Sequence, residues 1–302
     1  MTTKSRSYHE PVLLQPCLEG LSVKAGGIYV DATFGGGGHA KAILNEESDL
    51  RLFGFDQDPD ALANVPKDDR FTLIPENFRY LQRFLRLEGV NQVDGILADL
   101  GVSSHQFDTP ERGFSIRFEG PLDMRMNPEV GMSAAELIAN STKEELQQLF
   151  SEFGEVRNAR TLAEAIINEQ NIAPLSRTED LVRVAGSVAK GPANKYLAQV
   201  FQALRIAVND EVLALKEFLE QSLEVLRPGG RLVVISYHSL EDRLVKQFMK
   251  WGGFGAEPEK DLYGNFPQPF KQITRKPIIP DDREVQINPR ARSARLRIAE
   301  KK

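Results

Sequence analysis

Acidic side chains and a run of glycines lie close together early in the chain. Four glycines occupy positions 35–38, shortly after Asp31, and a second acid, Asp56, stands 21 residues beyond Gly35. Glycine permits backbone conformations and close approaches that a Cβ would block. An acid at this distance from a glycine turn commonly accepts hydrogen bonds from both ribose hydroxyls. The spacing therefore predicts a nucleoside-binding crevice in which Asp56 binds the ribose.

Two nucleoside cofactors are compatible with this crevice. The pattern Gly35-x-Gly37-x-x-Ala40 satisfies the loose dinucleotide fingerprint, which keeps an NAD-linked dehydrogenase as an alternative. A pyrophosphate at the start of the following helix, however, would be repelled by Asp31. S-adenosyl-L-methionine has no phosphate and carries a cationic amino group and a sulfonium. The order acid, glycine turn, acid favours this methyl donor.

A third acid, Asp99, ends an apolar run and is followed by Ser103 and Ser104. Ligands of open α/β sheets bind outside the carboxyl ends of the strands, so these polar groups are expected to face the cofactor and the acceptor. The alternative is that Asp99 caps a turn and that the two serines begin a helix.

Strand and helix patterns alternate over the first hundred residues. Strands are expected at 28–32, 51–56, 71–74 and 93–100, with helical stretches at 40–45, 59–64 and 78–88. This alternation predicts an α/β fold with a parallel, doubly wound sheet.

From 105 to 205 the patterns are helical, with capping boxes expected at Ser133/Glu136 and Ser141/Glu144. A long helical pattern over 194–226 ends at RPGG (227–230), and strands are expected at 231–236, 270–274 and 294–299 after a loose loop at 251–269. The predicted organisation is a discontinuous domain, 1–104 with 206–302, split by a helical insert, 105–205.

Composition limits the remaining possibilities. The single cysteine, Cys17, excludes intrachain disulfides and a four-cysteine zinc site. The four histidines, His9, His39, His105 and His238, show no ligand spacing, so no metal is expected. No apolar run has the length of a signal peptide or a membrane span, which predicts a cytoplasmic protein.

Charge is distributed unevenly along the chain. The net charge is −5, yet residues 271–302 hold ten Lys and Arg against four Asp and Glu. The insert holds 14 acids against 11 bases, so it is not an obvious RNA clamp. A basic strip such as NPRARS (288–293) can guide a polyanion to one face, and a solvated terminal strand is the alternative interpretation.

Several strings together resemble the bacterial 16S rRNA cytosine-N4 methyltransferase family known as RsmH, formerly MraW. They are HEPVLL (9–14), DATFGGGGH (31–39), DGILADLGVSS (94–104), ERGFS (111–115), GPLDMRM (120–126), FQALR (201–205), HSLEDR (238–243) and NPRARS (288–293). The strings GPLDMRM and HSLEDR belong to no generic methyltransferase pattern, and the similarity extends from about Tyr8 to Glu300.

The resemblance implies a Rossmann-like methyltransferase sheet and methylation of a cytidine N4 in the decoding region of 16S rRNA. It implies S-adenosyl-L-methionine as cofactor, 16S rRNA within the small ribosomal subunit as partner, and substrate recognition by the insert. It leaves the oligomeric state open, a homodimer included. The implied cofactor contacts fall on Gly37, Gly38, His39, Asp56, Phe78, Asp99 and Gln106. His105 departs from the family, which usually has proline there.

Cytosine N4 is a poor nucleophile because its lone pair is delocalised into the ring. Catalysis then depends mainly on positioning, and Asp99 is the candidate catalytic acceptor for the amine hydrogen. Phe78 or Tyr237 could supply an aromatic face to the unstacked base, with Phe78 expected against the adenine of the cofactor. His238 has two interpretations, a contact to the base or a structural bond to Glu241 or Asp242. A non-enzymatic ribosome assembly factor is the third functional hypothesis.

Overall fold

The computed structural model describes residues 11–255, 257 and 268–302. The chain forms two compact units, Met1–Gly101 with Ala214–Lys302, and Val102–Leu213. The predicted boundaries, after 104 and after 205, lie three and eight residues from these. His9, with Glu10, and most of the loop expected at 251–269 lie outside the described residues.

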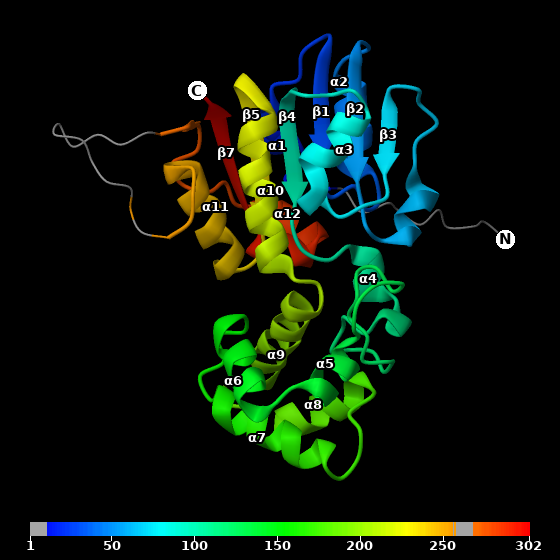
Figure 1. Cartoon of the computed structure of the whole chain (residues 1–302), viewed down its shortest axis with the longest axis vertical. Helices are drawn as coiled ribbons and strands as arrows, with labels where there is room; N and C mark the ends of the chain where they lie inside the picture. The colour runs from blue at the N-terminus through cyan, green and yellow to red at the C-terminus, as the bar shows by residue number, and fades with distance from the viewer. Residues whose placement is uncertain (1–10, 256, 258–267) are drawn as a thin grey trace. The chain divides into compact units, whose positions relative to one another are not determined.

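The first unit is built on one seven-stranded sheet with the order β3-β2-β1-β4-β5-β7-β6. Neighbouring strands from β3 to β5 are parallel, and β7 pairs antiparallel with both β5 and β6. The strands are β1 (Gly27–Asp31), β2 (Leu50–Phe55), β3 (Phe71–Ile74), β4 (Val93–Asp99), β5 (Leu226–Ser236), β6 (Phe270–Gln272) and β7 (Arg295–Lys301). This is the doubly wound, Rossmann-like sheet predicted from the alternating patterns (Figure 1).

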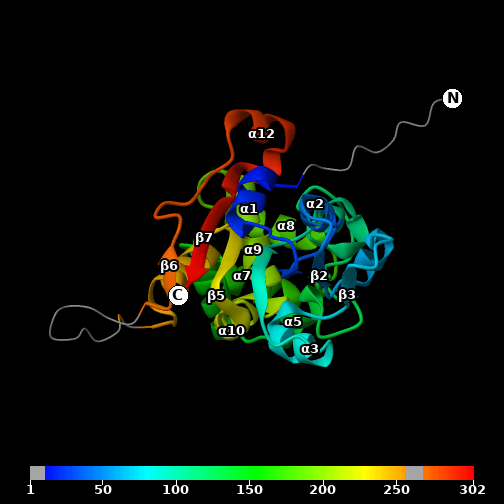
Figure 2. The same ribbon diagram turned by 90° about the horizontal axis from the view of Figure 1, so that it is seen from above.

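Helices cover both faces of this sheet. Figure 2 shows α1 and α2 on one side of the strands and α3 and α10 on the other. The helices of this unit are α1 (Leu14–Leu21), α2 (Gly38–Glu46), α3 (Leu81–Leu87), α10 (Glu211–Val225, beginning in the other unit), α11 (Ser239–Trp251) and α12 (Asp282–Ile287), and the 3-10 turns are η1 (Pro59–Asn64), η2 (Phe78–Tyr80) and η4 (Pro289–Ser293). None of the helices described is long and apolar enough to cross a membrane.

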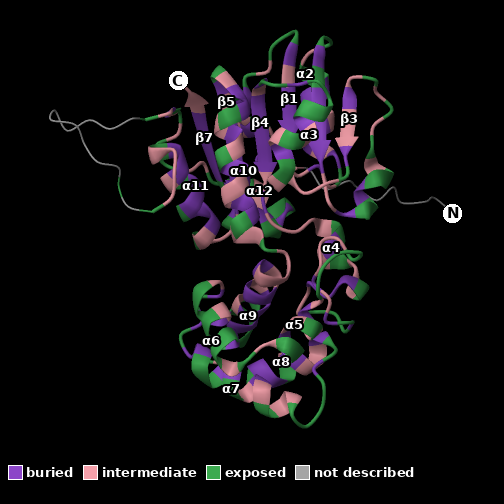
Figure 3. Ribbon diagram, in the orientation of Figure 1, coloured by how far each residue is buried: buried purple, intermediate pink, exposed green. Residues whose placement is uncertain are grey.

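The central strands read as continuous apolar runs because both of their faces are covered. Val30, Leu97 and Ile235 are each fully buried, and Figure 3 shows the strands of the sheet as its most buried part. Burial on both faces leaves only the ends of the strands to carry polar groups within reach of a ligand.

The second unit contains helices around its own apolar core. Its elements are α4 (Ser104–Asp108), η3 (Pro110–Arg112), α5 (Ala134–Asn140), α6 (Lys143–Glu152), α7 (Ala159–Gln170), α8 (Thr178–Ser187) and α9 (Ala193–Val208). The capping box at Ser133/Glu136 is confirmed. The second box was placed one residue too early: Thr142 and Glu145 cap α6, while the Ser141 hydroxyl donates to the Leu137 carbonyl at the end of α5.

The helical pattern expected over 194–226 is interrupted. Helix α9 ends at Val208 and α10 begins at Glu211, with Asp210 in the left-handed region at φ 50°. Asn209 holds this break, because its side chain bonds the backbone of Met124 and Met126 in addition to the Arg205 carbonyl. A single helix through this point would remove those bonds.

Candidate active site

Three acids mark the carboxyl ends of three neighbouring strands. Asp31 ends β1, Asp99 ends β4, and Asp56 directly follows β2. The chain passes from β1 to β2 on one side and from β4 to β5 on the other, so β1 and β4 flank the point where strand order reverses. Open α/β sheets bind their ligands at this point. The fold therefore brings together the acids that sequence spacing singled out.

Asp31 is a buried carboxylate with one unsatisfied oxygen. Asp31 is only 1% exposed. Its Oδ1 accepts a hydrogen bond from the Thr33 N–H at 3.2 Å, whereas its Oδ2 has no hydrogen-bond partner among the described residues. Burial raises the pKa of Asp31 to about 6. A buried carboxylate of this kind is costly unless a cation compensates it. The site therefore suits a ligand that carries positive charge.

The glycine turn is required by the packing of the protein itself. Gly37 has φ 71°, and a Cβ there would lie 2.9 Å from the ring of Phe34. A Cβ on Gly38 would lie 2.5 Å from Pro11. These contacts give an intramolecular reason for glycine at both positions, in addition to the ligand approach expected from the sequence.

Asp56 braces the same turn. Its Oδ2 accepts from the Gly35 N–H at 2.7 Å and its Oδ1 from the Asp58 N–H at 2.8 Å. On the other side of the turn, the Asn64 amide donates to the Gly35 carbonyl at 3.0 Å. A carboxylate has about four acceptor positions, so these two bonds are compatible with further bonds to hydroxyl groups.

His39 lies in the first turn of α2 and is almost fully buried. Its Nε2 is 3.1 Å from the Val12 carbonyl, and its Nδ1 is 4.0 Å from Oδ2 of Asp99. Because a carbonyl can only accept, Nε2 carries the hydrogen in this arrangement. Burial lowers the pKa of His39, so its ring is neutral near neutral pH. The ring serves to connect the glycine turn to the Val12 backbone.

Asp99 forms the most specific polar contact of this edge. The hydroxyl of Tyr237 donates to its Oδ1 at 2.7 Å, and the Asp99 N–H donates to the Thr33 hydroxyl, also at 2.7 Å. Desolvation raises the pKa of Asp99 to about 7, although the bond from Tyr237 acts in the opposite direction. An acid that titrates near neutral pH is suited to accept a proton.

Tyr237 is held by the start of α11. Oε2 of Glu241 accepts from the Tyr237 N–H at 2.9 Å, and Nδ1 of His238 accepts from the Glu241 N–H at 3.4 Å. His238 is thus the N-cap of α11, with its Nε2 3.1 Å from Oε1 of Glu241. Of its two predicted roles, the structural bond to Glu241 is present.

Two further predicted cofactor residues lie on other elements. Phe78, in η2, packs against Phe218 in an edge-to-face arrangement, with ring centroids 5.1 Å apart. Gln106 belongs to the second unit, where it forms the capping box of α4: its Oε1 accepts from the Ser103 N–H and its N–H donates to the Ser103 hydroxyl. Ser103 and Ser104 therefore begin a helix, as the alternative interpretation held.

Four residues, Val12, Leu13, Tyr237 and Glu284, form contacts at the site that the sequence did not predict. Tyr237 was considered only as an aromatic face, and its bond to Asp99 was not foreseen. The Val12 carbonyl contacts His39, and the adjacent Leu13 N–H donates to Oε1 of Glu284 at 2.7 Å. No sequence signal connects Leu13 with a residue 271 positions away.

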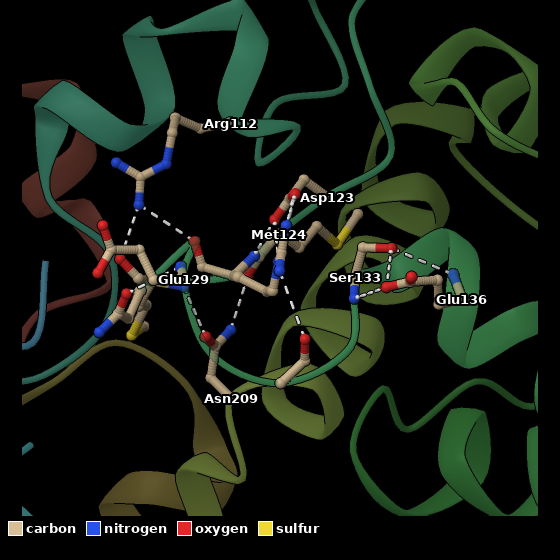
Figure 4. Close-up of polar contacts among 11 residues, drawn as sticks. Arg112, Asp123, Met124, Glu129, Ser133, Glu136 and Asn209 are labelled. Atoms are coloured by element: carbon tan, nitrogen blue, oxygen red, sulfur yellow. Dashed lines mark hydrogen bonds and ion pairs between the residues drawn. The ribbon is translucent and has the colours of Figure 1, made fainter.

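The string GPLDMRM (120–126) forms a tightly bonded loop in the second unit (Figure 4). Met124 is left-handed at φ 62°, and the Arg112 guanidinium donates to the carbonyls of Arg125 and Met126 at 3.1 and 2.7 Å. Asn209 donates to the Met124 carbonyl and accepts from the Met126 N–H. These hydrogen bonds hold the backbone of residues 124–126 in one conformation.

The sequence profile of the MraW methylase family matches residues 6–302. The chain belongs to the MraW methylase family. This confirms the resemblance inferred from the motifs. Membership in the MraW methylase family covers both units, because the match runs through the helical unit as well as the sheet.

Relatives extend over the whole chain. A protein named Ribosomal RNA small subunit methyltransferase H from Flavobacterium johnsoniae is 56% identical over 301 residues, 99% of both chains. One of the same name from Parabacteroides distasonis is 53% identical over 304 residues, 100% of both. Among solved structures, an rRNA methylase from Streptococcus thermophilus is 14% identical with a TM-score of 0.42, covering 98% of this chain and 99% of that one.

Proposed function

We propose that this protein transfers a methyl group from S-adenosyl-L-methionine to the N4 amine of a cytidine in 16S rRNA of the small ribosomal subunit. The observation that carries the proposal is the near full-length identity, 56%, to a relative named Ribosomal RNA small subunit methyltransferase H. The choice of the cytidine N4 rests on the resemblance of the sequence motifs to the cytosine-N4 methyltransferase family, and the proposed mechanism rests on the chemistry of the strand ends.

The residues of the sheet edge fit this methyl donor. The unsatisfied Oδ2 of Asp31 suits a cationic group, and a phosphate would be repelled by it. Asp56 lies at the end of β2, where a carboxylate can accept hydrogen bonds from a ribose diol. Gly37, Gly38 and His39 would line the methionine side of the ligand, and Phe78 would pack against the adenine. We also propose Gln106, which closes the capping box of α4, as a contact to the donor.

When bound, the donor supplies an electrophilic methyl group on a sulfonium, which is already a good leaving group. The chain's own contribution is positioning and a proton acceptor. Asp99 would accept a hydrogen bond from the N4 amine, which orients the nitrogen lone pair toward the methyl carbon. As the N–C bond forms and the S–C bond breaks, the nitrogen gains positive charge and loses one proton to the Asp99 carboxylate. Tyr237 keeps Oδ1 of Asp99 in place while Oδ2 faces the amine.

A direct test uses small ribosomal subunits from cells that lack this protein. Purified protein and isotopically labelled S-adenosyl-L-methionine are added, and the rRNA nucleosides are analysed by mass spectrometry. The proposal predicts labelled N4-methylcytidine at one site. Label on a different base or atom would refute the assigned chemistry, and absence of any label would favour an assembly factor that does not catalyse.

A further inference from the structure

The turn η4 lies at the same edge of the sheet as the proposed proton acceptor. Strand β7 runs antiparallel to β5, and Arg295 stands opposite Ser236. The residues just before β7 are therefore neighbours of the residues just after β5. The residues before β7 form η4, and the first residue after β5 is Tyr237, whose hydroxyl donates a hydrogen bond to Asp99.

The backbone of η4 is fixed by packing and by a cap. Ala291 and Ala294 are buried in the apolar cluster that contains Leu97 and Ile235, and Tyr237 packs against the same cluster. At the start of the turn, Asn288 is 8% exposed; its Oδ1 accepts from the Arg290 N–H and its carbonyl accepts from the Ala291 N–H. The backbone of η4 is therefore held in one conformation at the surface.

The outward side of η4 consists of Arg290, Arg292 and Ser293, all exposed; these three residues are called the η4 face below. Two other arginines, Arg295 and Arg297, bind the carboxylate of Asp242 in α11. The η4 face presents two exposed arginines and an exposed serine on a backbone that is capped and packed, at the edge that carries Asp99.

We infer that the η4 face is a phosphate-binding surface for the RNA backbone beside the nucleotide that is methylated. The inference rests on the proposed function and adds the element that holds the substrate. Guanidinium groups suit phosphate because they donate two parallel hydrogen bonds to its oxygens. A base that leaves its stack to enter a pocket needs its flanking backbone held, and phosphate contacts supply such positioning without reading sequence. The methyl donor carries no phosphate, so RNA is the polyanion in question.

The test compares two double variants, each of which removes two positive charges from residues 271–302. Arg290→Ala/Arg292→Ala removes the η4 face. Arg275→Ala/Lys276→Ala is the matched control, because these two exposed cations lie beside the middle of β7, between Thr274 and Ile278, which bond Ile298 and Leu296. Binding to unmethylated small subunits is measured over a range of salt concentrations. Each lost phosphate contact should lower the slope of log affinity against log salt by about 0.7, so the first variant should lose about 1.4 and the control much less.

The same variants are then tested for methyl transfer and for S-adenosyl-L-methionine binding. Loss of the η4 face should raise KM for the subunit, leave kcat at saturating substrate within about twofold of the wild type, and leave affinity for the donor unchanged. A wild-type salt slope and KM in Arg290→Ala/Arg292→Ala would overturn the inference, as would an equal loss in the control. Failure of the unaltered protein to methylate subunits would count against the proposed function instead, and the salt slope would still decide the role of the η4 face.

Discussion

The hydroxyl of Tyr237 lies 2.7 Å from Oδ1 of Asp99, and this bond joins the end of β4 to the start of α11. The bond stabilises the ionised form of Asp99, whose pKa burial has raised to about 7. If Asp99 accepts the amine proton, kcat/KM should rise with pH as this carboxyl ionises.

Replacing Tyr237 by Phe removes the bond and keeps the ring. The pKa of Asp99 should then rise, because the ionised form has lost a donor, and the acidic limb of kcat/KM should move to higher pH by roughly 1 unit, since a hydrogen bond to a charged group contributes about 1.5 kcal/mol. Asp99→Asn, which cannot accept the proton, should lower kcat by about 10²-fold or more at every pH. A Tyr237→Phe profile that coincides with that of the wild type would remove Tyr237 from the proposed mechanism.

Asp31 should oppose folding near neutral pH and support donor binding. Its pKa is raised in the folded state, to about 6 from an ordinary 3.8, so the stability contribution is fully present below pH 3.8 and is lost as pH rises through about 6. Asp31→Asn should therefore be more stable than the wild type at pH 8, by up to about 3 kcal/mol, and should bind S-adenosyl-L-methionine more weakly. Urea unfolding at pH 4 and pH 8, paired with calorimetry, measures both effects. Equal stability of the two proteins at pH 8 would contradict the prediction, because it would mean that burying the ionised Asp31 carboxylate costs no folding free energy.

Asp56 has two roles, because its carboxylate accepts hydrogen bonds within the protein and is also proposed to bind the donor. Because its carboxylate accepts from the Gly35 and Asp58 N–H groups, Asp56→Ala should lose donor affinity and also about 1–3 kcal/mol of folding stability. Asp56→Asn retains one acceptor oxygen and separates the two effects better. Donor affinity close to that of the wild type in Asp56→Asn, measured by calorimetry, would argue against a ribose contact.

Glu284 should act on the cofactor turn from a distance. Its Oε1 accepts from the Leu13 N–H, and the adjoining residues Pro11 and Val12 contact Gly38 and His39. Glu284→Ala should weaken donor binding severalfold, whereas Glu284→Gln, which keeps an acceptor oxygen, should bind close to normally. Calorimetry on both variants distinguishes this positioning effect from a change of surface charge, because both substitutions remove the same charge. Equal weakening in the two variants would point to charge.

Sequence reasoning located the three strand-end acids because the strands themselves are readable. Apolar runs buried on both faces leave a clear signal, and a polar residue at the end of such a run is conspicuous. Local ambiguity limited the rest. Ser141 and Thr142 each stand three residues before a glutamate, so either could open a capping box, and only the bond from Ser141 to Leu137 decides the register. The break at Asp210 depends on Asn209 reaching the loop at 124–126, which is a tertiary contact.

The hydrogen bonds of Tyr237 and Glu284 could not be predicted from sequence patterns, because each joins residues far apart in the chain. The Tyr237–Asp99 bond spans 138 residues and depends on β4 and β5 being neighbours in register. Parallel pairing predicts that strand ends meet, but it does not predict which side chains orient toward one another. The donor-binding roles of seven residues and the catalytic role of Asp99 stay predictions; the seven are Gly37, Gly38, His39, Asp56, Phe78, Asp99 and Gln106.

The bond between Leu13 and Glu284 also bears on how the protein is made. Glu284 is synthesised 271 residues after Leu13, so the segment that contacts the glycine turn lacks this bond until the second unit and most of the first have been translated. We expect nascent polypeptides that stop short of α12 to lack a finished cradle for the methyl donor, even with β1 to β5 already translated. Competence for chemistry would then arrive late in translation, after nearly all of the sheet has been assembled.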